Sequence, residues 1–533
     1  MIKFVKKHWQ ELLLAVFILV AGILRFYHIN RLEFFTYDQS RDALFVKRMI
    51  VDHEPRLLGT QTSLPGMYLP PFYYYTIAVV LWISNLNPVG VDVYSALIGV
   101  LTVPLAFYVA NKVFGKPAGV FSAGLFAVSP LIVELTRRAW NPNTLPFFIL
   151  IAFWFFFKYY QERKTKDFLL GFVFYGYCLS LHFGVWTMFP LVIFTWLYSL
   201  FKDKNPKILL GAFLIILFFV SPLVFFELRH NFFLVSQAKI FFFDGGHIGT
   251  SASNLLESFF SSLVALFTIL ISGKILVGYE APFEFSGRLG DLFSLSRPIS
   301  VVAQKPFSLS FQWWGTLIFG LILGICLFYL FGKKKKKENL PVLLILIWIF
   351  WGVFASRLYS GPFFFFYYLF VFPAPILLFG LLFKKIWEQK WGKFFSLGFF
   401  VLIFGFHLKN STVFLGGWRN FDDLKAVGLA IAENVSDKSF NIATIQKESD
   451  RWDRNAVDYR YFTETYGGKR ALGWYPQDYR QAEELFVVDE TGGIGAAGSN
   501  AMEIEEFGPG KETGRWELEK GIVLIKFDKR EER

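Results

Sequence analysis

A single acidic residue stands out in residues 35–42, which read Phe-Thr-Tyr-Asp-Gln-Ser-Arg-Asp and closely follow an apolar stretch of membrane-helix length. A carboxylate among aromatic residues at a membrane interface is partly desolvated, which tunes it toward use as a base. Asp38 is therefore a candidate general base. The alternative is that Asp38 caps an amphipathic helix over residues 39–52. The position of Asp38 in the sequence leaves both interpretations open.

The composition places this segment in a membrane protein. Of the 533 residues, 54% are hydrophobic and 20% aromatic, and the mean hydropathy is +0.43. A soluble domain cannot bury so large an apolar fraction. Several apolar stretches approach the ~20 residues that cross a bilayer as a helix. The first, residues 9–27, lacks a small-residue cleavage site, so we interpret it as a retained membrane helix and not as a signal peptide.

The distribution of charge argues against nucleic acid as a partner. Residues 409–533 contain 18 basic and 23 acidic residues, a net charge of −5, whereas the whole chain carries +12. The positive excess therefore lies in the apolar part, in short loops, as the positive-inside rule predicts. The two cysteines, Cys178 and Cys326, both lie in apolar segments, so we predict no disulfide and no thiol-based metal site.

The basic loops predict a topology with a cytoplasmic N-terminus. The apolar stretches 71–84 and 255–272 are then expected to lie in the interface or to re-enter the membrane without crossing it. The external segments are loops 28–91, 134–142 and 227–312 and the tail 409–533. About eleven spanning helices are predicted, at residues 9–27, 92–113, 118–133, 143–160, 167–183, 186–201, 206–226, 313–332, 340–355, 362–383 and 394–408.

The tail differs from the rest in its polar composition. Its patterns predict a helix over 421–435, strands over 440–445, 485–489 and 522–527, and a mobile loop over 492–499. The sequence thus predicts two domains, a membrane domain over 1–408 and a small external α/β domain over 409–533. No nucleotide-binding or metalloprotease motif is present.

The order of several motifs carries a resemblance to a known family. A Pro-Pro-aromatic stretch lies at 68–74, a helix rich in small residues ends in Ser129-Pro130, and an arginine-containing loop follows at 137–143. Together with the acidic motif after the first helix, this order resembles the GT-C superfamily of membrane glycosyltransferases. The protein O-mannosyltransferase and aminoarabinose transferase branches are the most similar, over roughly residues 9–400. The resemblance implies an all-α, GT-C-like polytopic membrane fold with interfacial helices in its external loops.

The resemblance also implies roles for acidic residues. Asp38 resembles the family's general base, which receives the proton of an acceptor hydroxyl. The family often has a second acidic residue where this sequence has Gln39, and many members have one in the second loop, where it has Asn141 and Asn143. Glu134 could substitute. We therefore predict no metal ligands, and a divalent cation remains only a weakly supported cofactor.

The leaving lipid phosphate is expected to require cations. The candidates are Arg137 and Arg138, whose alternative role is interfacial snorkelling. His182 stands where relatives often have a lysine, although a lone histidine in an apolar helix is more often a packing residue. The pair Arg357 and Tyr359 resembles the late motif that closes the family's phosphate site, and Arg357 could equally be an interfacial anchor. Gln39 and Arg41 are possible accessory residues.

The predicted function is transfer of a sugar, mannose or a similar hexose, from a polyprenyl-phosphate donor to a protein, lipid or glycan acceptor. The reaction is expected to be inverting and to occur on the external face of the plasma membrane, with the reacting residues facing the same side. One alternative is a transporter or flippase of lipid-linked sugars, although few charges fall at the bilayer midplane and no duplication is evident. The other alternative is a non-catalytic scaffold for envelope glycans.

Overall fold

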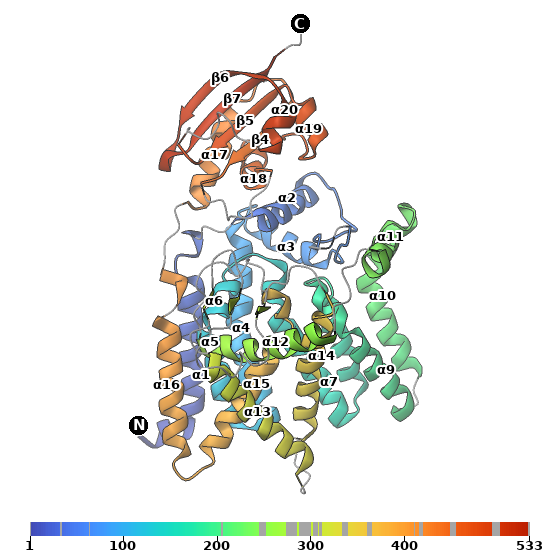
Figure 1. Ribbon diagram of the computed structural model, residues 1–533, viewed down its shortest axis with the longest axis vertical. Helices are drawn as coiled ribbons and strands as arrows, with labels where there is room; N and C mark the ends of the chain where they lie inside the picture. Colours follow the sequence, from blue (N-terminus) through green and yellow to red (C-terminus); the bar gives the residue numbers. More distant parts are fainter. Residues whose placement is uncertain are drawn as a thin grey trace. The chain divides into compact units, whose positions relative to one another are not determined.

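The computed structural model divides the chain into two compact units, each described here by itself (Figure 1). The membrane unit comprises Met1–Tyr27, Arg56–Tyr73 and Val93–Phe414, and the mixed unit comprises His28–Pro55, Tyr74–Asp92 and Leu415–Arg533. The structure describes residues 2–31, 35–62, 64, 66–203, 206–244, 252–272, 285–286, 300–301, 307–308, 312–332, 339–359, 365–409, 411–414, 419–447, 455–492 and 501–530.

The membrane unit is built almost entirely of helices. Among the residues that the structure describes, seven helices are long and apolar enough to cross a membrane, or eight if the bent pair α5–α6 is one span, so the multi-pass membrane fold is confirmed. Each of the eleven predicted spans overlaps a helix, and the number eleven stays a prediction. The helices are α1 Ile2–Phe26, α4 Val89–Phe114, α5 Lys116–Val128, α6 Pro130–Thr136, α7 Leu145–Glu162, α8 Thr165–Cys178, α9 Phe189–Asp203, α10 Pro206–Arg229, α13 Gln312–Phe331, α14 Asn339–Ser356, α15 Pro373–Trp387 and α16 Gly392–Lys409.

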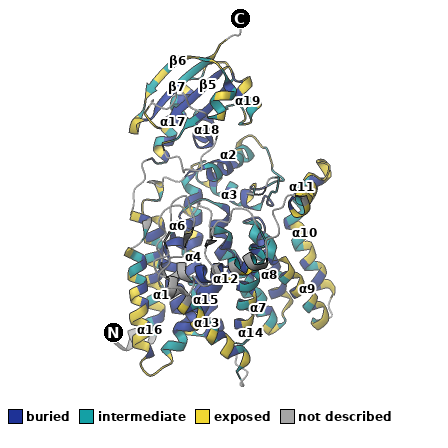
Figure 2. Cartoon of the chain, in the orientation of Figure 1, coloured by how far each residue is buried: buried dark blue, intermediate teal, exposed yellow. Residues whose placement is uncertain are grey.

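Large apolar side chains lie on the outer faces of several of these helices. Phe201 of α9 is 73% exposed, and Leu228 of α10 and Phe394 of α16 are similarly open (Figure 2). Contiguous apolar surface of this kind is unfavourable in water and suits lipid as the solvent.

The other elements before the tail are shorter or lie between these helices in the sequence. The stretch predicted not to span at 71–84 forms α3 Phe72–Ile83, which from Tyr74 on belongs to the mixed unit, and its 12 residues are too few to cross a bilayer. The stretch at 255–272 lies in α12 Ala252–Ser272, and its placement in the interface stays a prediction. The other connecting elements are α11 Phe233–Lys239 and the short antiparallel strands β1 Phe285–Ser286, β2 Ser300–Val301 and β3 Phe307–Ser308.

A proline breaks the helix that leads into the loop predicted over residues 134–142. The axes of α5 and α6 differ by 59° at Ser129-Pro130. Pro130 has no N–H to donate to the carbonyl of Phe126, four residues earlier. Arg25 of α1 supplies the missing donors: its Nη2 is 2.9 Å from the oxygen of Phe126, and its Nη1 is 3.1 Å from that of Ala127. The fully buried Arg25 thus stabilises the kink.

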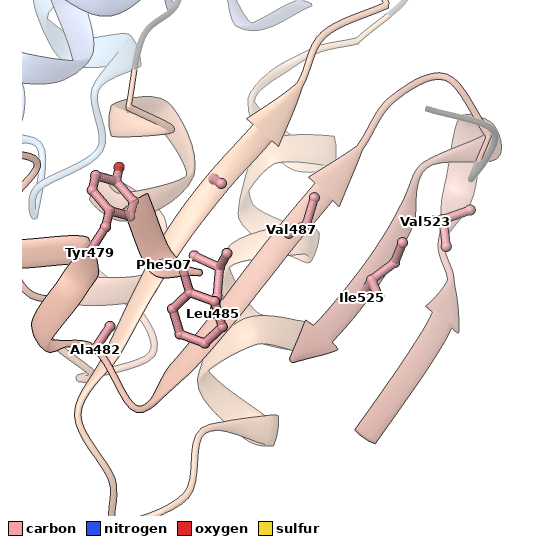
Figure 3. Packing of buried hydrophobic residues seen from close by; sticks show 8 residues of the cluster. Tyr479, Ala482, Leu485, Val487, Phe507, Val523 and Ile525 are labelled. Carbon is pink, nitrogen blue, oxygen red and sulfur yellow. The ribbon is translucent and has the colours of Figure 1, made fainter. Parts of the chain in front are cut away.

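The mixed unit contains a four-stranded sheet in the order β4-β5-β7-β6. Strand β4 (Phe440–Ile445) is parallel to β5 (Glu484–Asp489), whereas β7 (Val523–Lys529) is antiparallel to both β5 and β6 (Gly510–Glu517). Side chains on one face, including Leu485, Val487 and Ile525, form a buried apolar core (Figure 3). The helices are α17 Phe421–Asn434, α18 Val457–Thr465, α19 Pro476–Gln481 and α20 Met502–Phe507.

Within the mixed unit, the segment 35–55 packs against the C-terminal tail. Helix α2 (Tyr37–Val51) contacts α18, and the ring of Phe35 lies 5.4 Å from those of Phe421 and Tyr461. The helix and the three strands predicted for the tail are confirmed. Residues 493–499 of the predicted loop lie outside the described residues. The boundary predicted between residues 408 and 409 stays a prediction.

Candidate functional site

Asp38 lies in the first turn of α2. The helix begins at Tyr37 and its N-cap is Thr36, so the interpretation of Asp38 as the cap of a helix over 39–52 is wrong. The position still suits a carboxylate, because the N-terminal end of a helix favours negative charge. One carboxylate oxygen lies 2.9 Å from Nη1 of Arg41, and the Asp38 side chain remains 37% exposed. Asp38 is therefore held in place and open to solvent.

Arg41 connects Asp38 to a buried acidic residue. Its Nη2 donates to Oδ1 of Asp42 at 2.8 Å and its Nε donates to the same oxygen at 3.0 Å. The hydroxyl of Tyr74 also donates to Oδ1 of Asp42, at 2.8 Å. Burial raises the pKa of Asp42, and the Arg41 guanidinium opposes that rise. All four residues lie in the mixed unit, and we name them the Asp38 network: Asp38, Arg41, Asp42 and Tyr74.

Gln39 lies beside this network without joining it. Its side chain is 5% exposed, and its Oε1 accepts a hydrogen bond from the Thr36 hydroxyl. The residue that stands at the family's second acidic position thus helps to order the start of α2. The accessory role predicted for Gln39 stays a prediction.

In the membrane unit, Arg137 follows α6 and binds the end of α1. Its Nη1 donates to the carbonyl of Leu24 at 2.7 Å and its Nη2 to that of Tyr27 at 2.8 Å. These carbonyls belong to the last turn of a helix, where a cation is favourable. Arg137 is only 2% exposed. It therefore caps the end of a helix inside the protein, whereas a snorkelling arginine would extend its guanidinium to the membrane surface. Arg25 of α1 thus binds carbonyls of α5, and Arg137 binds carbonyls at the end of α1.

The second loop, predicted over residues 134–142, is held by ion pairing and by amide hydrogen bonds. Arg138 pairs with Glu134, one helical turn earlier. The Asn143 side chain donates to the carbonyl of Arg138 at 3.0 Å, and that of Asn141 donates to the carbonyl of Leu181 at 2.6 Å. Glu134 is therefore engaged by a cation. In the part of the chain that the structure describes, no three His, Cys, Asp or Glu side chains gather as a metal site would require.

His182 lies next to this loop. It is the N-cap of the short 3-10 helix Phe183–Met188, and its Nδ1 accepts from the N–H of Gly184 at 3.0 Å. Its ring centroid lies 5.3 Å from that of Tyr367 and 6.1 Å from that of Phe366. Because Nδ1 is an acceptor, a proton on the neutral ring resides on Nε2. Any hydrogen bond that His182 donates to a ligand therefore comes from Nε2.

The structure brings His182 and the second loop together around one aromatic residue. The Trp140 ring lies 4.5 Å from that of Phe366, which also contacts His182. Asn141 bonds the residue that precedes His182. Within the membrane unit, Trp140 and Asn141 of the second loop are thus neighbours of His182.

Arg357 and Tyr359 follow the last turn of α14. The N–H of Arg357 donates to the carbonyl of Val353 at 3.1 Å, and its guanidinium interacts electrostatically with the Tyr368 hydroxyl. The Tyr359 ring lies 6.2 Å from that of Phe241. The adjacent Ser360-Gly361-Pro362 lies outside the described residues. The phosphate role of Arg357 and Tyr359 stays a prediction.

Two residues of these networks were missed in the sequence. Arg25 lies within a predicted membrane helix, and an arginine there was itself a signal of a buried partner. Tyr74 is one ring in the aromatic run 72–75, and nothing in the pattern distinguishes its hydroxyl from its neighbours. Both depend on partners far away in the sequence.

Comparison with known proteins gives the following matches. Residues 69–226 match a family described as dolichyl-phosphate-mannose-protein mannosyltransferase. The crystal structure of ArnT from Cupriavidus metallidurans bound to undecaprenyl phosphate is similar at 12% identity and a TM-score of 0.45, over 97% of this chain and 98% of that chain. The apo state of ArnT from the same organism gives 12% identity and a TM-score of 0.44, over 98% of each chain. No curated protein matches the sequence.

The segment matched by the family model contains most of the motifs on which the resemblance was based. It includes the Pro-Pro-aromatic stretch, the kink at Ser129-Pro130, the second loop and His182, whereas Asp38 and Arg357 lie outside it. The resemblance predicted from the sequence is confirmed: this chain is similar to the GT-C superfamily of membrane glycosyltransferases.

Proposed function

We propose that this protein transfers a sugar from a polyprenyl-phosphate donor to an acceptor hydroxyl, with Asp38 as the general base. The family matched over residues 69–226 is described by a donor of this class, a sugar joined to a lipid phosphate. The proposed sugar is mannose or a similar neutral hexose. The acceptor is a protein, a lipid or a glycan on the external face of the plasma membrane.

The arrangement of the Asp38 network is the observation that supports Asp38 as the base. A base must be accessible to the acceptor and must also be held in a fixed position. Asp38 is partly exposed, and Arg41 holds it at 2.9 Å. Arg41 is in turn fixed by the buried Asp42 and, through Asp42, by Tyr74. Of these residues, only Asp38 combines a carboxylate with an accessible side chain.

The proposed reaction is a single displacement. The acceptor oxygen attacks the anomeric carbon while its proton passes to a carboxylate oxygen of Asp38, and the bond between the anomeric carbon and the phosphate oxygen breaks. Attack opposite to the leaving group inverts the configuration at that carbon. The phosphate leaves as an anion, so cations at its position lower the barrier. The proposed phosphate ligands are Arg137, Arg138, His182, Arg357 and Tyr359.

The test replaces Asp38 in the purified full-length protein. Asp38→Asn keeps the shape of the side chain and removes the base, and loss of a general base lowers the rate by roughly 100- to 10,000-fold. We expect that loss when transfer from a labelled polyprenyl-phosphate hexose is measured in proteoliposomes. The control is Asp422→Asn, since Asp422 also lies in the first turn of a helix, α17, and is exposed.

Two results would count against the proposal. A fully active Asp38→Asn protein would remove Asp38 from the mechanism. A wild-type protein that moves the lipid-linked sugar between leaflets without transferring it would favour the flippase alternative.

A further inference from the structure

The mixed unit contains a pocket that none of the proposed chemistry uses. Its volume is about 150 Å³, and its lining comes from the end of α2, from α18 and from residues 470–474. A cavity of roughly this size accommodates one six-membered ring. The charged and aromatic side chains of its lining are Arg48, Arg460, Glu464, Arg470 and Trp474.

The single carboxylate in the lining is already neutralised by protein cations. Oε1 of Glu464 accepts from Nζ of Lys47 and from Nε of Arg48, both at 3.0 Å, and Oε2 accepts from Nη2 of Arg48 at 2.7 Å. These contacts lower the pKa of Glu464 against the opposing effect of burial. The side chain of Arg460 is used within the fold, where it binds the carbonyls of Asn455 and Leu472. The lining therefore contains three arginines and one carboxylate, which suits an anionic ligand.

Two of these arginines provide positive charge for that ligand. Arg48 uses Nε and Nη2 for Glu464, and its Nη1 has no protein partner among the described residues. Arg470 is 51% exposed, and its nearest carboxylates, those of Glu54 and Asp52, lie at 3.3 Å and 3.8 Å from Nη1. Ion pairs at such exposed positions contribute little to the stability of the fold and rearrange easily. Guanidinium groups bind carboxylate and phosphate groups through paired hydrogen bonds.

The remaining wall of the pocket includes an aromatic ring. The centroid of Trp474 lies 5.7 Å from that of Phe45 on α2, and this packing fixes the orientation of the indole. Large, rigid aromatic surfaces beside a few polar groups are typical of small-molecule sites. An indole together with two guanidinium groups therefore suits a flat-sided ring that carries an anionic group.

We propose that this pocket binds a six-membered sugar ring bearing a carboxylate or a phosphate. We assign the ring to the acceptor, and only that assignment rests on the proposed function. Arg48 lies ten residues after Asp38 on α2, which is about 15 Å along a helix that rises ~1.5 Å per residue. The bound ring is therefore a recognition unit remote from the hydroxyl that reacts. The acceptor is accordingly an extended acidic glycan.

Ligand binding to the full-length protein in nanodiscs tests the pocket. The probes are glucuronic acid, glucose 6-phosphate, glucose and inorganic phosphate, titrated by calorimetry or by saturation-transfer NMR. We expect one or both of the acidic sugars to bind, and the preferred one identifies the anionic group. Glucose should bind about tenfold more weakly, because it lacks the charged hydrogen bonds. Inorganic phosphate binding as tightly as glucose 6-phosphate would overturn the proposed recognition of a ring.

Variants place the binding in this pocket. Arg470→Ala, at a half-exposed position, should weaken binding of the acidic sugar about tenfold, and Trp474→Leu should weaken binding of every sugar. The matched control is Arg515→Ala on β6, which removes another exposed arginine that is ion-paired, here to Glu512 at 2.7 Å. Binding that does not saturate, or that is unchanged in Arg470→Ala, would overturn the proposal.

The two proposals fail separately. A protein that binds acidic sugars without transferring any sugar contradicts the proposed function alone. A protein that transfers a sugar and does not bind acidic rings contradicts the pocket alone.

Discussion

At the residue scale, one buried arginine organises the proposed base. Arg41 bonds the partly exposed Asp38 on one side and the buried Asp42 on the other. An unpaired charge in such a position would be costly, so each member of the network depends on the others. Tyr74 completes the network through its hydroxyl. Asp38 and Arg41 were singled out in the sequence, whereas the contact of Tyr74 was not, because Tyr74 lies 32 residues from Asp42.

Removing the Tyr74 hydroxyl tests this network. Burial already raises the pKa of Asp42, so this residue stabilises the fold less as the pH rises through that pKa. Tyr74→Phe removes a donor to the charged carboxylate and should raise the pKa further. We expect the free energy of unfolding to fall by about 1.5–3 kcal/mol at pH 7 and by less at pH 4, as measured by thermal unfolding of the purified protein.

Tyr75→Phe provides the matched control for that measurement, because it removes the hydroxyl of the next residue, whose ring is 42% exposed. Equal losses at the two pH values would contradict the role assigned to the Tyr74 hydroxyl.

At the element scale, the apolar periodicity predicted most helices and three of the four strands in the sheet of the mixed unit. It missed β6 because Gly510–Glu517 reads Gly-Lys-Glu-Thr-Gly-Arg-Trp-Glu and lies at the sheet edge, where none of its residues is buried. It also could not predict the 59° bend at Pro130, since whether a proline kinks or ends a helix depends on what else satisfies the carbonyls. Here Arg25 supplies those donors from α1.

The kink should therefore depend on Arg25. Arg25→Leu leaves the carbonyls of Phe126 and Ala127 without these donors in a buried position, which costs roughly 1–3 kcal/mol for each unsatisfied group. We expect a clearly lower melting temperature in detergent, followed by fluorescence-detected size-exclusion chromatography. Arg229→Leu, at an exposed arginine that ends α10, should melt as the wild type does. An unchanged melting temperature in Arg25→Leu would show that the kink is stable without it.

At the scale of the whole molecule, the sequence predicted the membrane class from composition and the two chemically distinct parts from charge. It did not predict that residues 28–55 and 74–92 form one compact unit with the C-terminal tail. That grouping depends on contacts such as those of Lys47 and Arg48 with Glu464, which join residues more than 400 positions apart. Charge patterns indicate on which side of the membrane a loop lies. They carry no information on which distant residues contact one another.

The central claim is that the proposed base and the proposed phosphate ligands face the same side of the membrane. Labelling of introduced cysteines with a membrane-impermeant maleimide in intact cells measures this directly, because the native Cys178 and Cys326 are buried. We expect His28→Cys, in the loop before Asp38, and Trp140→Cys, in the second loop, to react from outside. Glu162→Cys should react only after the cells are opened. Reaction of the first two from opposite sides of the membrane would contradict the account.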